Sequence, residues 1–305
     1  MRFAVTYPVS HPSNPELVSG TGVAAVAAAA EKAGFHGIGF GDHPAPPQRW
    51  LDAGGHDTPD PFVAMGFAAA RTTALRLIPN IVVLPYRNPF LVAKAGATLD
   101  VLSGGRFTLA VAMGYLKREF AALGADFDDR AVLFDEALDA IRSIWTADDV
   151  SLEGRNFSAR GITAHPRPVS TPYPPIWIGG NTGRARQRVV THGDGWSPFA
   201  ASPGMAQTAG TAAIDTVERL TEGIDDLRRR FDAADRDWSA IDISFTIFAD
   251  DNHSDTEFNA EACLADIDEL AAAGVTWVQV VLPGDSLTQT LEAIDRFGQL
   301  VIDGV

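Results

Sequence analysis

The stretch LRLIPNIVVLPYRNP, Leu75 to Pro89, decides how the chain is divided into strands and helices. It begins as an apolar run typical of a strand that is covered on both faces. Pro79 and Asn80 interrupt this run, and both residues are poor in strand interiors, so the interruption indicates a bulge or argues against the strand. Asn88 and Pro89 then supply a helix N-cap and a first helical residue. The stretch therefore predicts a strand, irregular at its centre, that leads into a helix.

The same alternation of strand and helix continues on both sides of this stretch. Apolar runs predict strands at 3–7, 37–41, 75–84, 106–112, 175–179, 193–197, 241–249 and 276–282. Helical periods predict helices at 22–33, 60–71, 89–102, 129–146, 183–191, 210–234 and 255–273, and a last helix after the eighth strand. Eight strand and helix pairs predict an α/β fold, the eight-stranded (β/α) TIM barrel, with an open doubly wound sheet as the alternative.

One polar, proline-rich segment at 147–174 does not fit this repeat. We expect it to be an excursion between the fourth helix and the fifth strand, either a small hairpin or a lid over the barrel mouth. A chain of 305 residues suits one large domain or two small ones, and the eight strand and helix pairs fit one barrel. We therefore expect one domain over residues 1–305.

Composition limits the classes of partner. The 305 residues are 46% hydrophobic and carry a net charge of -15, so a large core is expected and nucleic acid and anionic membranes are poor partners. The single cysteine, Cys263, argues against a disulfide framework and fits a reducing, cytoplasmic location. The alanine-rich run at 23–30 ends at Glu31 and Lys32, too early to span a bilayer.

In a barrel of this kind, the active site lies at the carboxyl ends of the strands. That rule selects a set of residues that follow predicted strands: Tyr7, Asp42, His43, Pro79, Asn80, Met113, Gly114, Gly179 to Thr182, and Trp196. A histidine can donate or accept a proton, and a neighbouring carboxylate can bias its charge, so Asp42 and His43 are candidates for catalysis. They also fit an ordinary loop before prolines. His56 and Asp57 lie nearby, but no HxH or HExxH spacing occurs, so no metal site is expected.

The segment PIWIGGNTGRARQRVVTHGDGW, residues 175–196, indicates an anion site. A helix begins near Thr182, just after Gly179 and Gly180, and Arg184, Arg186 and Arg188 lie near its start. Cationic side chains at that end oppose the helix dipole, whereas an anion bound to the free N–H groups would convert this repulsion into attraction. The glycines would let the anion approach closely. The alternative is a glycine turn with solvated arginines.

Three segments together resemble a known family: LPYRNPFLVAKAGATLDVLSGGRFTLAVAMGYLKREFAALG at 84–124, FDDRAVLFDEALDAIRSIW at 127–145, and the segment 175–196. They resemble the luciferase-like monooxygenase superfamily, in its actinobacterial branch of deazaflavin (coenzyme F420) dependent oxidoreductases. The resemblance is strong from about residue 35 to residue 196 and continues weakly to the C-terminus. It implies the bacterial-luciferase-like barrel and a bulge behind the isoalloxazine ring, commonly with a non-proline cis peptide, which here matches the bond from Asn80 to Ile81.

The resemblance also implies the residues of a cofactor site. These are Asp42 and His43 beside the ring, Asn80 and Ile81 behind it, Gly114 after the fourth strand, and Gly179, Gly180, Asn181 and Thr182 at the phosphate. The implied activity is hydride transfer between coenzyme F420 and an unidentified small organic substrate. In this interpretation His43 polarises or protonates the reacting centre, Asp42 orients His43, and four aromatic residues line the substrate pocket: Tyr7, Trp50, Trp196 and Phe199.

Three alternatives remain at this stage. An FMN-dependent monooxygenase fed by a separate reductase needs the same ring slot, a non-catalytic flavin-binding barrel would bind without turnover, and a metal-dependent barrel hydrolase would contain metal. Members of the family are commonly dimers, so a homodimer through the helices at 60–71 and 89–102 is expected. Tyr115 stands where a sugar-phosphate dehydrogenase of the family has an acidic residue, and the only lysines are Lys32, Lys94 and Lys117. The substrate of that enzyme is therefore not expected here.

Overall fold

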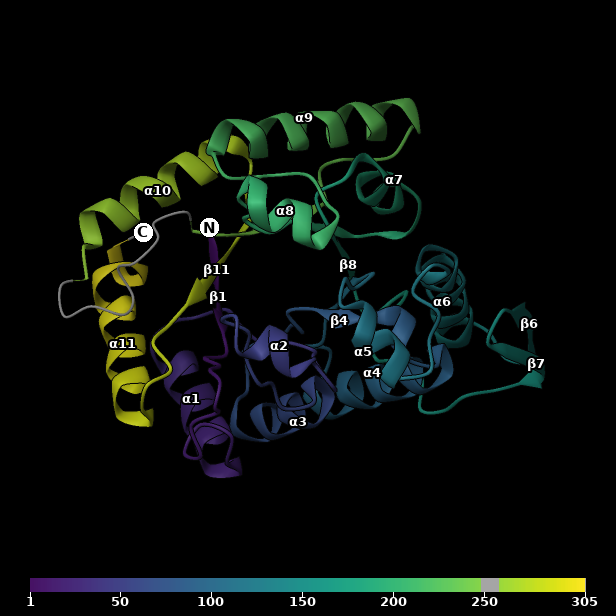
Figure 1. Ribbon diagram of the computed structural model, residues 1–305, viewed down its shortest axis with the longest axis horizontal. Helices are drawn as coiled ribbons and strands as arrows, with labels where there is room; N and C mark the ends of the chain where they lie inside the picture. Colours follow the sequence, from purple (N-terminus) through teal and green to yellow (C-terminus); the bar gives the residue numbers. More distant parts are fainter. Residues whose placement is uncertain (248–257, 305) are drawn as a thin grey trace.

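The computed structural model describes residues 1–247 and 258–304, and a parallel sheet of nine segments lies at its centre (Figure 1). The order across the sheet is β3-β2-β1-β11-β10-β9-β8-β5-β4. The segments are β1 (Arg2–Thr6), β2 (Gly37–Gly39), β3 (Arg76–Leu77), β4 (Val82–Val83), β5 (Leu109–Ala112), β8 (Ile176–Gly179), β9 (Gly195–Ser197), β10 (Asp242–Thr246) and β11 (Trp277–Val281).

The interrupted stretch forms the closure of this sheet. The residues predicted as one strand at 75–84 form β3, which pairs with β2, and β4, which pairs with β5. The N–H of Leu77 in β3 donates to Arg106 O at 2.9 Å, and Thr108 N donates to Leu77 O at 3.0 Å, just before β5. These bonds join β3, one end of the order given above, to the residues that lead into β5 near its other end, so the sheet curls into a barrel of the TIM type. The bond from Asn80 to Ile81 between the two halves is cis, as the family resemblance implied.

Helices surround the barrel (Figure 1). The outer layer consists of α1 (Gly20–Lys32), α3 (Pro61–Arg71), α4 (Pro89–Ser103), α6 (Arg130–Thr146), α7 (Gly183–His192), α9 (Val217–Ala233), α10 (Ala260–Ala273) and α11 (Leu287–Leu300). Shorter turns are α2 (Gln48–Leu51), η1 (Leu84–Tyr86), α5 (Lys117–Ala122), α8 (Pro203–Ala209) and η2 (Ile302–Gly304). Local chemistry sets the boundaries: the side chain of Asn88 accepts from Phe90 N at 2.9 Å to start α4, and Gly104 at φ 68° ends it.

One predicted helix begins at the wrong residue, and some short helices were not predicted. The long helix predicted at 210–234 is wrong at its start, because Gly210 at φ 63° ends α8 and Thr216 caps a separate helix, α9. The short helices α2 and α5 were not predicted, because neither is long enough to show a helical period. The predicted strand end at 248–249 and helix start at 255–257 lie outside the described residues.

Large side chains fill the barrel interior near its base, and small side chains line it near its mouth. Ala4, Ile78, Ala110, Trp177 and Trp277 form the buried interior cluster, with the two tryptophan rings 5.4 Å apart. Alternate residues of a strand point the same way, so the next inward positions toward the mouth are small in three strands: Thr6, Ala112 and Gly179. The interior is therefore packed at its base, and Ile81 lies against this cluster from the mouth side, where a Cβ on Gly179 would be 2.7 Å from its Cδ1.

The segment 147–174 contains an antiparallel hairpin, β6 (Val150–Gly154) and β7 (Phe157–Ile162). Arg155 N donates to the Glu136 carboxylate of α6 at 2.8 Å, and the ring of Phe157 lies 5.6 Å from that of Phe90 in α4. These contacts hold the hairpin against the outer helices, beside α6 in Figure 1, and a role of the segment as a lid stays a prediction. Within the described ranges, no helix has the length and apolarity needed to cross a membrane.

Candidate active site

His43 follows β2 at the carboxyl end of the barrel, and its side chain is 12% exposed. Its backbone N–H donates to Thr58 Oγ1 at 3.1 Å, which ties the turn after β2 to the loop before α3. Its imidazole Nε2 has no hydrogen-bond partner among the residues that the structure describes. The structure therefore places His43 at the mouth, as predicted, with one ring nitrogen free.

Asp42 does not orient His43, which corrects the predicted role. It is 3% exposed, its Oδ1 accepts from Arg87 Nη2 at 2.7 Å, and its Oδ2 accepts from Val83 N at 3.0 Å. The Asp42 side chain therefore contacts β4 and Arg87, whereas the His43 ring contacts α5, so the two neighbours point to different elements. Burial lowers the pKa of Arg87, but the bonds to Asp42 outweigh it and raise that pKa overall. Asp42 is thus a buried structural residue that connects the end of β2 to β4.

The partner of His43 is Glu119, a fully buried residue of α5 that the sequence analysis missed. Its Oε2 lies 3.2 Å from Nδ1 of His43 and 2.8 Å from the hydroxyl of Tyr86, and its Oε1 accepts from Ala45 N at 2.9 Å. Burial raises the pKa of Glu119, yet these hydrogen bonds bring it below its ordinary value. The available signal was its place in GYLKREF, which follows the fourth predicted strand and so belongs to the same mouth.

Three further rings pack around His43. The ring of Trp50 lies 4.5 Å from the imidazole, that of His56 5.4 Å and that of Tyr115 6.2 Å. Burial, together with the nearby His43, lowers the pKa of His56 to about 4, so His56 is neutral near pH 7. Burial also raises the pKa of the Tyr115 hydroxyl. These four residues form the ring cluster, in which Trp50, His56 and Tyr115 are uncharged at physiological pH.

Two of the predicted pocket residues are core residues, which corrects their assignment. Tyr7 is 2% exposed, its ring stacks on Phe40 at 4.6 Å, and its hydroxyl donates to Leu17 O at 2.6 Å. Trp196 is fully buried against the outer helices, and its Nε1 donates to Gly180 O at 2.9 Å. Their apolar bulk is used in packing between strands and helices. Phe199 is half-buried at the end of β9, and its role in a substrate pocket stays a prediction.

The glycine loop after β8 has the geometry of a close-approach site. A Cβ on Gly179 would lie 2.7 Å from Cδ1 of Ile81, and Gly180 has φ +102°, where other residues are strained. Gly114, after β5, is at φ +76°, and a Cβ there would lie 2.5 Å from Val83 Cγ1. The loop therefore brings bare backbone beside Ile81.

Asn181 and Thr182 stabilise this loop. The amide of Asn181, 1% exposed, donates to Phe199 O and Ala212 O at 2.9 Å each, so its side chain is engaged by the protein. Thr182 caps α7 by accepting from Ala185 N at 3.2 Å. Any contact of Asn181 with a cofactor would thus come from its backbone.

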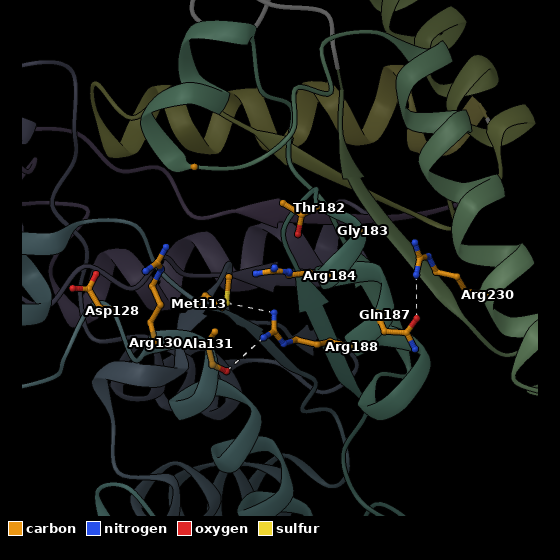
Figure 2. A pocket seen from close by; sticks show the side chains of 11 residues that line it. Met113, Asp128, Arg130, Ala131, Thr182, Gly183, Arg184, Gln187, Arg188 and Arg230 are labelled. Carbon is orange, nitrogen blue, oxygen red and sulfur yellow. Dashed lines mark hydrogen bonds between the residues drawn. The ribbon is translucent and has the colours of Figure 1, made fainter.

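A cavity of about 830 Å³ opens beside the N-terminus of α7 (Figure 2). Its lining is rich in arginine and includes a single acidic residue: Met113, Asp128, Arg130, Ala131, Thr182, Gly183, Arg184, Gln187, Arg188, Gly210 and Arg230. Figure 2 shows Arg184 and Arg188 extending from α7 toward Met113 and Arg130, with Arg230 on the other side beside Gln187. In an acidic chain, this concentration of cations indicates an anionic ligand.

The arginines of this cavity differ in how far they are neutralised. Arg188 pairs with Asp135 at 2.5 Å, and Arg230 pairs with Asp226 at 2.9 Å. In the described part of the chain, neither Arg130 nor Arg184 has a carboxylate within ion-pair distance. Arg186, which the sequence analysis grouped with the others, is not part of the lining and pairs with Asp226 at 2.6 Å. Arg130 also donates to Phe127 O at 2.7 Å and its guanidinium lies 3.9 Å from the Phe127 ring, so Arg184 is the lining cation most available to a ligand.

Residues 1–247 and 258–304 contain no cluster of three or more His, Cys, Asp or Glu side chains arranged to hold a metal ion. The site consists instead of the His43 pair, the ring cluster, the glycine loop and the arginine-lined cavity. All four lie at the carboxyl ends of the strands or at the helix starts that follow them. This is where a barrel binds its ligand.

The family model for luciferase-like monooxygenase matches residues 1–275, and the chain belongs to this family. An F420-dependent glucose-6-phosphate dehydrogenase of Beutenbergia cavernae is 32% identical over 232 residues, 70% of this chain and 68% of that protein. An FMNH(2)-dependent dimethylsulfone monooxygenase of Pseudomonas putida is 31% identical over 201 residues, 65% of this chain and 50% of that protein. The crystal structure of monooxygenase RslO1 from Streptomyces bottropensis superposes with a TM-score of 0.80 at 21% identity, covering 100% of this chain and 99% of that one. Relatives of both cofactor types therefore share the fold.

Proposed function

We propose that this protein is an oxidoreductase that binds coenzyme F420 at the barrel mouth and transfers a hydride between it and a small organic substrate. The observation that carries the proposal is the arginine-lined cavity that continues from the glycine loop. FMN ends in one phosphate, whereas F420 extends beyond its phosphate into further carboxylates. A cavity of about 830 Å³, in which neither Arg130 nor Arg184 has a carboxylate partner among the described residues, suits the longer, more anionic cofactor.

The residues present also fit the ring of a deazaflavin. The inward positions Thr6, Ala112 and Gly179 are small, and Asn80 is held at the mouth by a bond from its amide to Thr6 Oγ1 at 3.1 Å. Ile81 and the backbone of Gly114 and Gly179 would contact the ring. When bound, the cofactor supplies the hydride chemistry, and the protein supplies orientation and proton handling.

His43 is the group that would hold or move a proton at the substrate. Its Nε2 is free of protein partners in the described residues, and the ring cluster limits water around it. Tyr115 adds a neutral phenol where the sugar-phosphate dehydrogenase discussed above has an acid. The substrate of the Beutenbergia relative is therefore not assigned here, and an uncharged organic substrate suits the ring cluster better.

The test of this assignment is single-turnover kinetics of the F420-loaded protein. We expect His43→Gln to slow hydride transfer about 10²- to 10⁴-fold while F420 affinity changes little. His165→Gln, an exposed histidine of the excursion, is the matched control and should leave both quantities unchanged. Equal rates in His43→Gln and wild type, with a substrate found by an acceptor screen, would remove the catalytic role.

An FMN-dependent monooxygenase is the second candidate, and the similarity to the Pseudomonas monooxygenase favours it. It would use the same ring slot and require reduced flavin from a partner reductase. Oxygen consumption with reduced FMN and a candidate substrate would support it. Cofactor that binds tightly and never turns over with any acceptor would instead point to a carrier protein.

A further inference from the structure

We infer that Glu119 is a positioning residue that holds His43 in the tautomer with its proton on Nδ1. This inference rests on the proposed function, since it assigns His43 Nε2 as the nitrogen that faces the substrate. The starting observation is the contact of 3.2 Å between Glu119 Oε2 and His43 Nδ1. It joins α5 to the turn after β2 across 76 residues of sequence.

The hydrogen bonds around Glu119 define its charge. An ionised carboxylate is only an acceptor, and both oxygens of Glu119 face donors: Ala45 N on Oε1, and Tyr86 Oη on Oε2. Ala45 N can only donate, and the Tyr86 hydroxyl can donate into the same carboxylate. A fully buried carboxylate with these partners is stable in its charged form when the third partner also donates. His43 Nδ1 must then carry a proton.

The surroundings of His43 offer no competing charge. Of the rings packed against it in the described residues, those of Trp50 and Tyr115 are uncharged, and His56 is neutral near pH 7. Among the described residues, Glu119 is the one carboxylate within ion-pair distance of His43. Asp42, although adjacent in sequence, is bound to Arg87. Glu119 alone can therefore set the tautomer.

This arrangement has a defined consequence for proton transfer. With Nδ1–H directed at Glu119, the lone pair of Nε2 points away from the buried carboxylate and can accept a proton from a substrate O–H or N–H. The ring then becomes an imidazolium beside a carboxylate, which stabilises its positive charge. In the reverse direction, the same Nε2–H returns the proton. Glu119 keeps its own charge throughout and contacts neither substrate nor cofactor.

The direct test is ¹⁵N NMR of the cofactor-free protein labelled at histidine, at a pH where the His43 ring is neutral. Loss of one pair of signals in His43→Gln assigns the resonances. We expect His43 Nδ1 to show the shift of a protonated nitrogen and Nε2 that of an unprotonated one. A proton on Nε2, or an averaged mixture of tautomers, overturns the inference. Because no cofactor is present, this outcome is separate from failure of the proposed function.

A pair of variants adds a second test. Glu119→Gln keeps the size but can turn an amide N–H toward Nδ1, so the His43 proton should move to Nε2 and turnover should fall about 10²-fold or more. Tyr86→Phe removes a donor from the same carboxylate without touching the His43 bond, and it should keep the tautomer. An unchanged His43 tautomer in folded Glu119→Gln contradicts the inference. If Glu119→Gln does not fold, the ¹⁵N spectrum of the wild-type protein still shows which nitrogen of His43 carries the proton.

Discussion

Oδ1 of Asp42 lies 2.7 Å from Nη2 of Arg87, which contacts the exposed Asp60 at 3.1 Å with the same nitrogen. Asp42 is buried and also binds Val83 N, so this ion pair is part of the closure of the barrel between β2 and β4. We expect Asp42→Asn to lower the free energy of unfolding by on the order of 3 kcal/mol, because Arg87 would be left largely buried with a weaker partner. Urea unfolding measures this difference.

Asp60→Asn is the matched control for that variant. It removes the other carboxylate of Arg87 with the same change in charge, and asparagine remains a good N-cap for α3. An exposed pair of this kind contributes about 1 kcal/mol or less. If both variants lost the same stability, Asp42 would not have the structural role assigned to it.

Arg184 allows a test of the anion site that does not require turnover. Arg184→Gln should weaken F420 binding about tenfold at low salt, with a smaller effect at high salt, because it removes an unneutralised cation from the cavity. Arg219→Gln on α9 changes the charge equally but lies outside the cavity and pairs with Asp215. Fluorescence titration at two salt concentrations compares the variants. The same loss of affinity in both would exclude a local contact at Arg184.

His56 predicts a dependence of stability on pH. The pKa of His56 is about 4 in the folded protein and near 6.5 when unfolded, so between these values the unfolded chain binds the additional proton. The stability that neutral His56 gives to the folded protein is therefore lost as the pH falls from about 6.5 to 4. Compared with His56→Gln, the wild-type protein should lose on the order of 1 to 2 kcal/mol of additional free energy of unfolding over this pH range. This figure is reduced to allow for partial solvation of His56. Urea unfolding at several pH values measures it, and parallel curves for the two proteins would refute it.

A homodimer through α3 and α4 remains a prediction. Val63 and Phe67 on α3 are 64% and 49% exposed, and Leu91 and Leu102, which share a face of α4, are 70% and 75% exposed. Apolar faces of this kind are typical of interfaces. We expect a dimer by light scattering at micromolar concentration, and a monomer for Leu91→Glu. Val169→Glu, at an exposed valine of the excursion, should not change the mass, and a wild-type monomer would contradict the prediction.

The alternation of strands and helices was predictable because apolar periodicity and end signals are local. The irregular centre at Pro79 and Asn80 was visible for the same reason, since neither residue suits a strand interior. The break between α8 and α9 was missed, although Gly210 is a typical helix end, because the polar residues that follow it continue a helical pattern. Local sequence signals thus predicted most helices and strands, and the errors of these predictions lie mainly at the ends of elements.

The site was less predictable because its contacts join distant parts of the chain. Arg87 lies 45 positions from Asp42, and Glu119 lies 76 positions from His43, so no local pattern relates either pair. Adjacency of Asp42 and His43 suggested a pair, whereas the two side chains point to different elements. The glycine loop and Arg184 were found from sequence because a strand end, a helix start and cations occur together within ten residues. Contacts between residues that are far apart in the sequence can be identified only when the fold is known.

The most direct test of the central claim is parallel titration of the purified protein with F420 and with FMN, followed by fluorescence quenching. We expect saturable binding of F420 that is at least about tenfold tighter than that of FMN, since the arginine-lined cavity has space and cations for more than a single phosphate. Tighter binding of FMN, or no saturable binding of F420, would contradict this claim.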